Sequence, residues 1–125
     1  MKRSGQLKFS FGAKVTVVGS RNARDYKVVK DKLDEFQIKT KLKIVSIVTC
    51  GYAGTETIAR KWAKDNKVQH TMITGETPKE RSQRRVLQTD ALIAFPNGDD
   101  REMNFAIRFA MHRKKTVIIH STTKK

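Results

Sequence analysis

Five short apolar runs, separated by segments with helical spacing, place the strongest constraint on how this chain folds. The runs are rich in β-branched residues and lack polar alternation, and they cover residues 15–19, 44–49, 68–73, 91–95 and 116–120. Such strands are buried on both faces, as in a parallel sheet with helices on each side. The pattern therefore predicts an α/β fold, a three-layer sandwich around a mostly parallel sheet of five strands.

Helical spacing fills the gaps between most of these runs. Apolar residues three and four positions apart predict helices over residues 25–37, 55–66 and 101–113, and a short helix lies within residues 75–89. Phe105 and Phe109 widen the apolar face of the last long helix, so we expect it to be the most deeply buried. The same face would also suit self-association into a homo-oligomer.

Glycine-bearing loops follow the first, second and fourth runs, at residues 19–25, 50–56 and 96–102. Because the carboxyl ends of parallel strands meet at one edge of a sheet, we expect these loops to line a common ligand crevice. Gly51 and Gly54 permit close approach to the backbone, and Thr55 offers a hydroxyl at a helix start, where anions bind well. A plain strand-to-helix turn explains the two glycines equally well, and both interpretations stay open.

Arginines strengthen the phosphate interpretation. Ser20 and Arg21 directly follow the first strand, and the planar guanidinium of Arg21 suits a phosphate or a carboxylate. Arg81, Arg84 and Arg85 share one helix face with no acid between them, which predicts an anionic partner for the group. A solvated basic face is the alternative.

The net charge points to polyanions as partners. The chain has 125 residues and a formal net charge of +15, a field that attracts DNA, RNA or acidic proteins at long range. We expect a basic N-terminal tail at residues 1–13, in which Phe9 and Phe11 alternate as in an edge strand, one domain at residues 14–120, and a C-terminal tail at residues 121–125. The candidate polyanion contacts are Lys39, Lys41, Lys43, Arg84, Arg85, Arg113, Lys114 and Lys115.

Other classes of site find little support in the sequence. Asp99, Asp100 and Glu102 form a dense acidic spot that would suit Mg²⁺ or acid–base chemistry, but we favour a role at a helix start. Cys50 is the single cysteine and the three histidines are scattered, so we expect no disulfide, metal or cofactor. No apolar stretch reaches the about 18 residues of a membrane span, and we expect a cytoplasmic protein without membrane contact.

The order of these elements resembles the SLOG superfamily, and within it the YspA-like branch, over about residues 14–120. The motifs that carry the resemblance are VTVVGSR, VTCGYAGTETIARKWA and RSQRRVLQTDALIAFPNG. In this comparison Gly19, Ser20 and Arg21 match the first loop, and Glu56 stands where Asp is usual in the second. The resemblance implies a Rossmann-like sheet that binds nucleotides or nucleotide-derived ligands, as in cytokinin-activating phosphoribohydrolases and in the DNA-binding DprA proteins.

One departure from the family pattern bears on activity. Phosphoribohydrolases of the superfamily carry P-G-G-x-G-T-x-x-E, whereas residues 96–104 read PNGDDREMN, with Asn104 in place of the catalytic Glu. The resemblance thus implies binding of a phosphate-bearing ligand without turnover, in a signalling or phage-encoded accessory protein. The residues it implies are Gly19, Ser20, Arg21, Gly51, Tyr52, Gly54, Thr55, Glu56, Arg81, Ser82, Pro96, Asn97 and Gly98. A DprA-like nucleic-acid-binding protein and a nucleoside-monophosphate phosphoribohydrolase are the alternatives.

Overall fold

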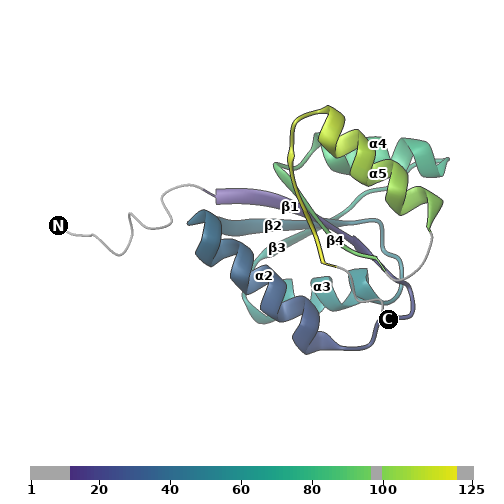
Figure 1. Cartoon of the computed structure of the whole chain (residues 1–125). Coiled ribbons are helices and arrows are strands. Elements are labelled where there is room, and N and C mark those ends of the chain that lie inside the picture. The colour runs from purple at the N-terminus through teal and green to yellow at the C-terminus, as the bar shows by residue number, and fades with distance from the viewer. Residues whose placement is uncertain (1–11, 97–99, 121–125) are drawn as a thin grey trace.

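Strands and helices alternate along the whole described chain. The computed structural model describes residues 12–96 and 100–120. Its elements are β1 (Gly12–Gly19), α2 (Tyr26–Thr40), β2 (Lys43–Thr49), α3 (Thr55–Asp65), β3 (Gln69–Met72), α4 (Pro78–Leu87), β4 (Ala91–Phe95), α5 (Arg101–His112) and β5 (Thr116–Ile119). Figure 1 shows α2 and α3 on one face of the sheet and α4 and α5 on the other, so the molecule has three layers.

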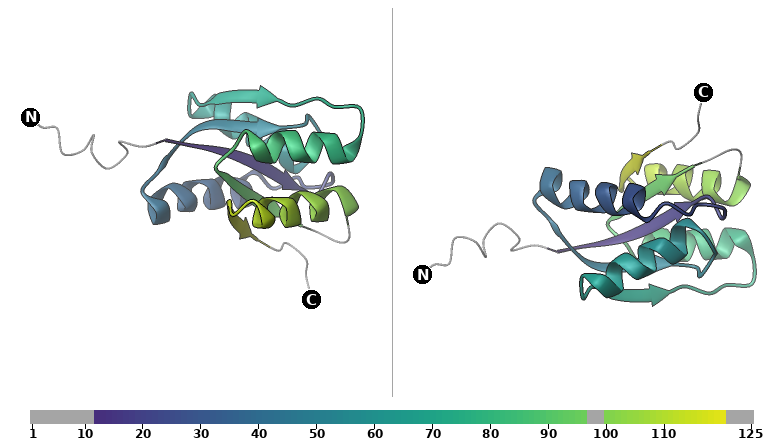
Figure 2. Two further views of the ribbon diagram at one scale, coloured as in Figure 1. Left: turned by 90° about the horizontal axis from the view of Figure 1, so that it is seen from above. Right: turned by 90° about the horizontal axis from the view of Figure 1, so that it is seen from below.

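The sheet fixes the place where a ligand crevice is expected. Its strand order is β3-β2-β1-β4-β5, and every neighbouring pair is parallel. The chain leaves β1 toward one side of the sheet and later returns to fill the other side from β4, as the two views of Figure 2 show. Strand order therefore reverses between β1 and β4, and the carboxyl ends of these two strands form the topological switch point.

Two apolar clusters hold the layers together. On the face covered by α2 and α3, the core includes Val17, Leu33 and Trp62, all nearly inaccessible to solvent. On the face covered by α4 and α5, Leu92 and Ala106 belong to a smaller cluster. Alternate residues of β1 and β4 point into opposite clusters, which explains why these strands are apolar without polar alternation.

The expected architecture is confirmed, and the sheet is parallel throughout. The first strand begins at Gly12, so the expected tail at residues 1–13 overlaps β1 by two residues. Phe9, Phe11 and the C-terminal tail lie outside the described residues.

The expectation of deepest burial for α5 is wrong: Phe105 and Phe109 are only partly buried and stack on each other, with ring centroids 6.0 Å apart.

An ion pair inside the domain links α4 to α3 and β1. Arg85 and Glu56 are 1% and 3% exposed, and Arg85 Nη2 lies 3.1 Å from Glu56 Oε2. Arg85 also donates through Nε to Thr16 Oγ1 (2.9 Å) and through Nη2 to the Val17 carbonyl (2.8 Å). Glu56 Oε1 accepts a hydrogen bond of 2.7 Å from the Cys50 amide. The pair thereby fixes α4, β1 and the β2–α3 loop relative to one another.

Removing one member of this pair should destabilise the fold strongly. Arg85→Met leaves the Glu56 carboxylate buried without its cation, and we expect a loss of about 3–5 kcal/mol in the free energy of unfolding, measured by urea denaturation. Glu56→Gln combined with Arg85→Met should cost less than Arg85→Met alone, because no buried charge then remains.

The neighbouring arginine supplies a matched control. Arg84 has a half-exposed side chain and pairs with Glu80 over 2.7 Å, so Arg84→Met should cost no more than about 1 kcal/mol. Equal losses for Arg84→Met and Arg85→Met would contradict the structural role of the buried pair.

Candidate functional site

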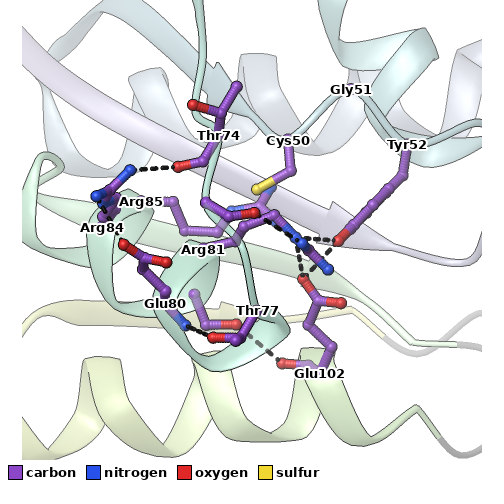
Figure 3. Close-up of polar contacts among 12 residues, drawn as sticks. Cys50, Gly51, Tyr52, Thr74, Thr77, Glu80, Arg81, Arg84, Arg85 and Glu102 are labelled. Carbon is purple, nitrogen blue, oxygen red and sulfur yellow. Dashed lines mark hydrogen bonds and ion pairs between the residues drawn. The ribbon is translucent and has the colours of Figure 1, made fainter.

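Four side chains from four segments meet at the carboxyl edge of the sheet. Arg21 follows β1, Tyr52 lies in the β2–α3 loop, Arg81 is in the first turns of α4, and Glu102 is in the first turn of α5. We call these residues the Arg-Tyr-Glu cluster. Figure 3 shows Tyr52, Arg81 and Glu102 converging on one point, with Arg85 deeper in the domain. The cluster lies beside the switch point between β1 and β4.

A chain of short hydrogen bonds connects the cluster. Arg81 Nε donates to the Tyr52 hydroxyl over 2.7 Å, and that hydroxyl donates to Glu102 Oε2 over 2.7 Å. Arg81 Nε is 3.5 Å from the same carboxylate oxygen, and Arg21 Nη2 is 3.8 Å from Glu102 Oε1. The Arg21 guanidinium also lies over the Tyr52 ring, 4.1 Å from its centroid. Two cations and a phenol hydroxyl thus surround one carboxylate.

The Tyr52 phenol is strongly biased toward its neutral form. Partial burial and the hydrogen bond to the Glu102 carboxylate raise the pKa of Tyr52 to about 12. Arg81 opposes this shift through its own hydrogen bond but does not reverse it. The hydroxyl therefore remains a donor at neutral pH and is directed at an anion.

Gly54 of the second loop and Gly19 at the end of β1 are both required by close packing. Gly54 has φ 77°, and a Cβ built there would lie 2.4 Å from the Ser20 carbonyl oxygen. A Cβ at Gly19 would lie 2.5 Å from Thr55 Oγ1. These two glycines let the β1–α2 and β2–α3 loops touch, and the turn is therefore a steric junction between the two loops.

Thr55 is used by that junction and does not face solvent. It is fully buried, and both its amide (2.9 Å) and its hydroxyl (3.0 Å) donate to the Ser20 carbonyl. The Ser20 hydroxyl accepts from the Asn22 amide over 3.1 Å. The expectation that the Thr55 hydroxyl is free for a phosphate is therefore wrong in this structure.

Gly54→Ala tests the steric account of this loop. The added Cβ would meet backbone atoms that cannot move easily, and we expect a loss of more than about 1 kcal/mol in unfolding free energy. Gly51→Ala is the matched control: its φ of 84° is similar, but the Cβ would meet the flexible Met72 side chain at 3.0 Å. A Gly51→Ala variant as unstable as Gly54→Ala would count against the junction.

The three arginines of α4 have acids of this chain as partners. Arg85, expected as a surface contact for polyanions, is buried, and its charge is already compensated by Glu56. Arg81 and Arg84 likewise have acids of this chain beside them, Glu102 and Glu80. The three arginines therefore do not form the uncompensated face that the sequence suggested.

The remaining predicted residues are distributed around the site. Ser82 is fully buried in α4, and its hydroxyl is 3.5 Å from the Glu102 carbonyl oxygen. Pro96 is half-buried at the end of β4, while Asn97 and Gly98 lie outside the described residues. Asp100 caps α5 by accepting from the Met103 amide over 3.0 Å, which confirms the helix-start interpretation for this acid.

A small pocket lies beside the cluster among the residues that the structure describes. It measures about 10 Å³, enough for about one water molecule, and Arg21, Tyr52 and Glu102 of the cluster line it together with Gly19, Glu56 and Met103. Burial raises the pKa of the adjacent Cys50 thiol, so its position near a helix start does not activate it. A nucleotide needs roughly several hundred Å³, so this pocket alone does not hold one.

Glu102 is the site residue that sequence reasoning missed. Glu102 lies in the first turn of α5, as the helix-start interpretation predicts, and its carboxylate in addition joins two arginines and a tyrosine. The position of Glu102 in the sequence could have indicated this role, because it follows the loop after the fourth strand and so lies at the same sheet edge as Arg21.

The described part of the chain shows no other obvious chemical centre. Within residues 12–96 and 100–120, no group of three or more His, Cys, Asp or Glu side chains is placed to hold a metal ion. Among the helices described, none is long and apolar enough to cross a membrane.

Comparison with known proteins places the chain in a family. A search of curated proteins gives no match. The model of the family described as "YspA, cpYpsA-related SLOG family" matches residues 13–76, which is just over half of the 125 residues. The match spans β1 to β3 and contains both loops of the steric junction, together with Arg21 and Tyr52. On this evidence the chain belongs to the YspA, cpYpsA-related SLOG family.

Proposed function

We propose that this protein binds a nucleotide or a nucleotide-derived ligand through a phosphate group at the Arg-Tyr-Glu cluster. The observation that carries the proposal is that the guanidinium groups of Arg21 and Arg81 both lie beside Tyr52, near the switch point of a parallel sheet. Membership of the family favours a nucleotide-related ligand.

The chemistry of the cluster suits a phosphate. Guanidinium groups bind phosphate oxygens through paired N–H donors, and a phenol hydroxyl adds a further donor. Arg21 has a half-exposed side chain, with 54% of its surface accessible, so a ligand can reach it from solvent. Arg81 is held in place by its bond to the Gly75 carbonyl (3.0 Å) as well as by Tyr52. Arg21 is therefore accessible to a ligand, and Arg81 is held in place by two hydrogen bonds.

Calorimetric titration with AMP, cyclic dinucleotides and ADP-ribose tests this proposal. At least one of them should give saturable heat, and Arg21→Ala or Arg81→Ala should weaken that binding about tenfold or more. Arg24→Ala is the matched control, because it removes an exposed arginine from the same loop without touching the cluster, and it should change affinity less than about twofold. Absence of binding to all the probes would overturn the proposal.

The wild-type protein can also be tested for hydrolysis of nucleotides. We propose binding without turnover, since Asn104 stands where the phosphoribohydrolases of the superfamily carry their catalytic Glu. Incubation with nucleoside monophosphates should release no free base above the level of a buffer blank.

A second candidate function, nucleic-acid binding, is favoured by charge at the opposite edge of the sheet. The connections that precede β2 and β5 are rich in lysine and arginine, and they lie at the amino ends of the strands. The basic residues there are Lys39, Lys41, Lys43, Arg113, Lys114 and Lys115. They are far from the cluster along the strands, so this surface and the phosphate site would act independently.

Three lysines at this edge adopt a backbone conformation that usually selects glycine. Lys41, Lys67 and Lys114 have φ of 60°, 58° and 62°, just after the ends of α2, α3 and α5. A side chain in this left-handed region costs about 1 kcal/mol, and glycine is the usual residue at such helix ends. Lysine at these three positions is therefore less favourable for stability than glycine would be, and it adds positive charge to the amino edge of the sheet.

Replacing these lysines separates nucleic-acid binding from stability. We expect a triple variant to keep or gain stability when it combines Lys41→Gly, Lys67→Gly and Lys114→Gly. For an oligonucleotide, the fall of log affinity with log salt should become less steep by about 3. The control is a triple variant that removes the same charge from the carboxyl edge, with Arg24→Gln, Lys27→Gln and Lys79→Gln. It should leave the slope nearly unchanged. Equal effects of the two triple variants would indicate attraction by net charge alone.

A further inference from the structure

The position of Glu102 raises a question about how the proposed site is used. Its carboxylate lies among Arg21, Arg81 and the Tyr52 hydroxyl, the same donors that a phosphate would need. Only 13% of the Glu102 side chain is exposed. The carboxylate therefore lies between these donors and does not point into solvent beside them. An anion of the protein thus takes the place expected for an anion of the ligand.

We infer that Glu102 is an internal competitor, which occupies the anion position in the free protein and must leave it when a phosphate-bearing ligand binds. The inference rests on the proposed function and adds to it the device that controls access to the site.

The geometry explains why the competitor can leave. Glu102 is held by one short bond, from Tyr52, and by two longer contacts of 3.5 and 3.8 Å to the arginines. Its backbone is fixed in the first turn of α5, which Asp100 caps, so rotation of the side chain alone can remove the carboxylate. A phosphate, with more oxygens and more negative charge, can engage both guanidinium groups at once.

The geometry also explains why the competitor is needed. Arg81 has 22% of its side chain exposed and Arg21 has 54%, and both guanidinium groups lie beside the Tyr52 ring and the Glu102 carboxylate. Glu102 offsets the repulsion between these two cations in the free protein. A phosphate that binds must replace that stabilisation and also overcome repulsion from the displaced carboxylate. Glu102 should therefore disfavour the binding of weakly charged anions.

Titration of wild-type protein and Glu102→Gln with AMP and with inorganic phosphate tests the inference. Glutamine keeps the size of the side chain but removes its charge, so Glu102→Gln should bind AMP about tenfold more tightly or better. Asp31→Asn is the matched control, because Asp31 is an exposed acid that pairs with Lys27 on α2, and it should change affinity less than about twofold.

The outcomes separate the inference from the proposed function. If wild-type protein binds a nucleotide and Glu102→Gln binds it equally or more weakly, Glu102 is not a competitor, and the proposed function stands without it. If neither protein binds AMP, phosphate, cyclic dinucleotides or ADP-ribose, both are overturned.

A measurement without ligand checks the premise. In a Tyr26→Phe background, Tyr52 is the remaining tyrosine, and its ionisation can be followed by absorbance. Burial and the hydrogen bond to Glu102 raise the pKa of Tyr52 to about 12, so Glu102→Gln should shift its titration to lower pH while circular dichroism reports an intact fold. An unchanged Tyr52 titration would overturn the inference, because Glu102 would then not occupy the anion position in solution.

Discussion

The buried ion pair between Arg85 and Glu56 is the interaction on which the rest of the site depends. Arg85 binds β1 through Thr16 and Val17, and Glu56 binds the amide of Cys50 at the start of the second loop. Isolated charges in such an interior would be very costly, so each partner requires the other. Arg81 lies one helical turn before Arg85, and the docking of α4 by the pair therefore also sets the position of Arg81 at the sheet edge.

The two edges of the sheet carry basic residues in different surroundings, and we propose a different role for each edge. At the carboxyl edge, Arg81 and Arg84 have acids of the chain itself beside them, and Arg81 is also held by its hydrogen bond to Tyr52. At the amino edge, lysines follow three helix ends, which suits the proposed contact with a flexible polyanion.

The fold could be predicted from sequence because strand and helix periodicity are local properties. The meaning of Gly54 could not be predicted, since the atoms that exclude a Cβ there belong to Ser20 and Arg21, more than thirty positions earlier in the chain. Arg84 and Arg85 are adjacent and chemically identical, yet one is exposed and the other buried. Ser82 and Val86, at helical spacing around Arg85, mark the buried face, but charge grouped Arg85 with its basic neighbours instead.

The most direct test of the account is an NMR titration of the arginine Nε–Hε signals with AMP. We predict that the signals of Arg21 and Arg81 shift together and saturate, while that of Arg113 at the amino edge moves little, which would locate the phosphate between the two cluster arginines. Saturable shifts confined to Arg113, with Arg21 and Arg81 unmoved, would contradict the assignment of the ligand site to the carboxyl edge.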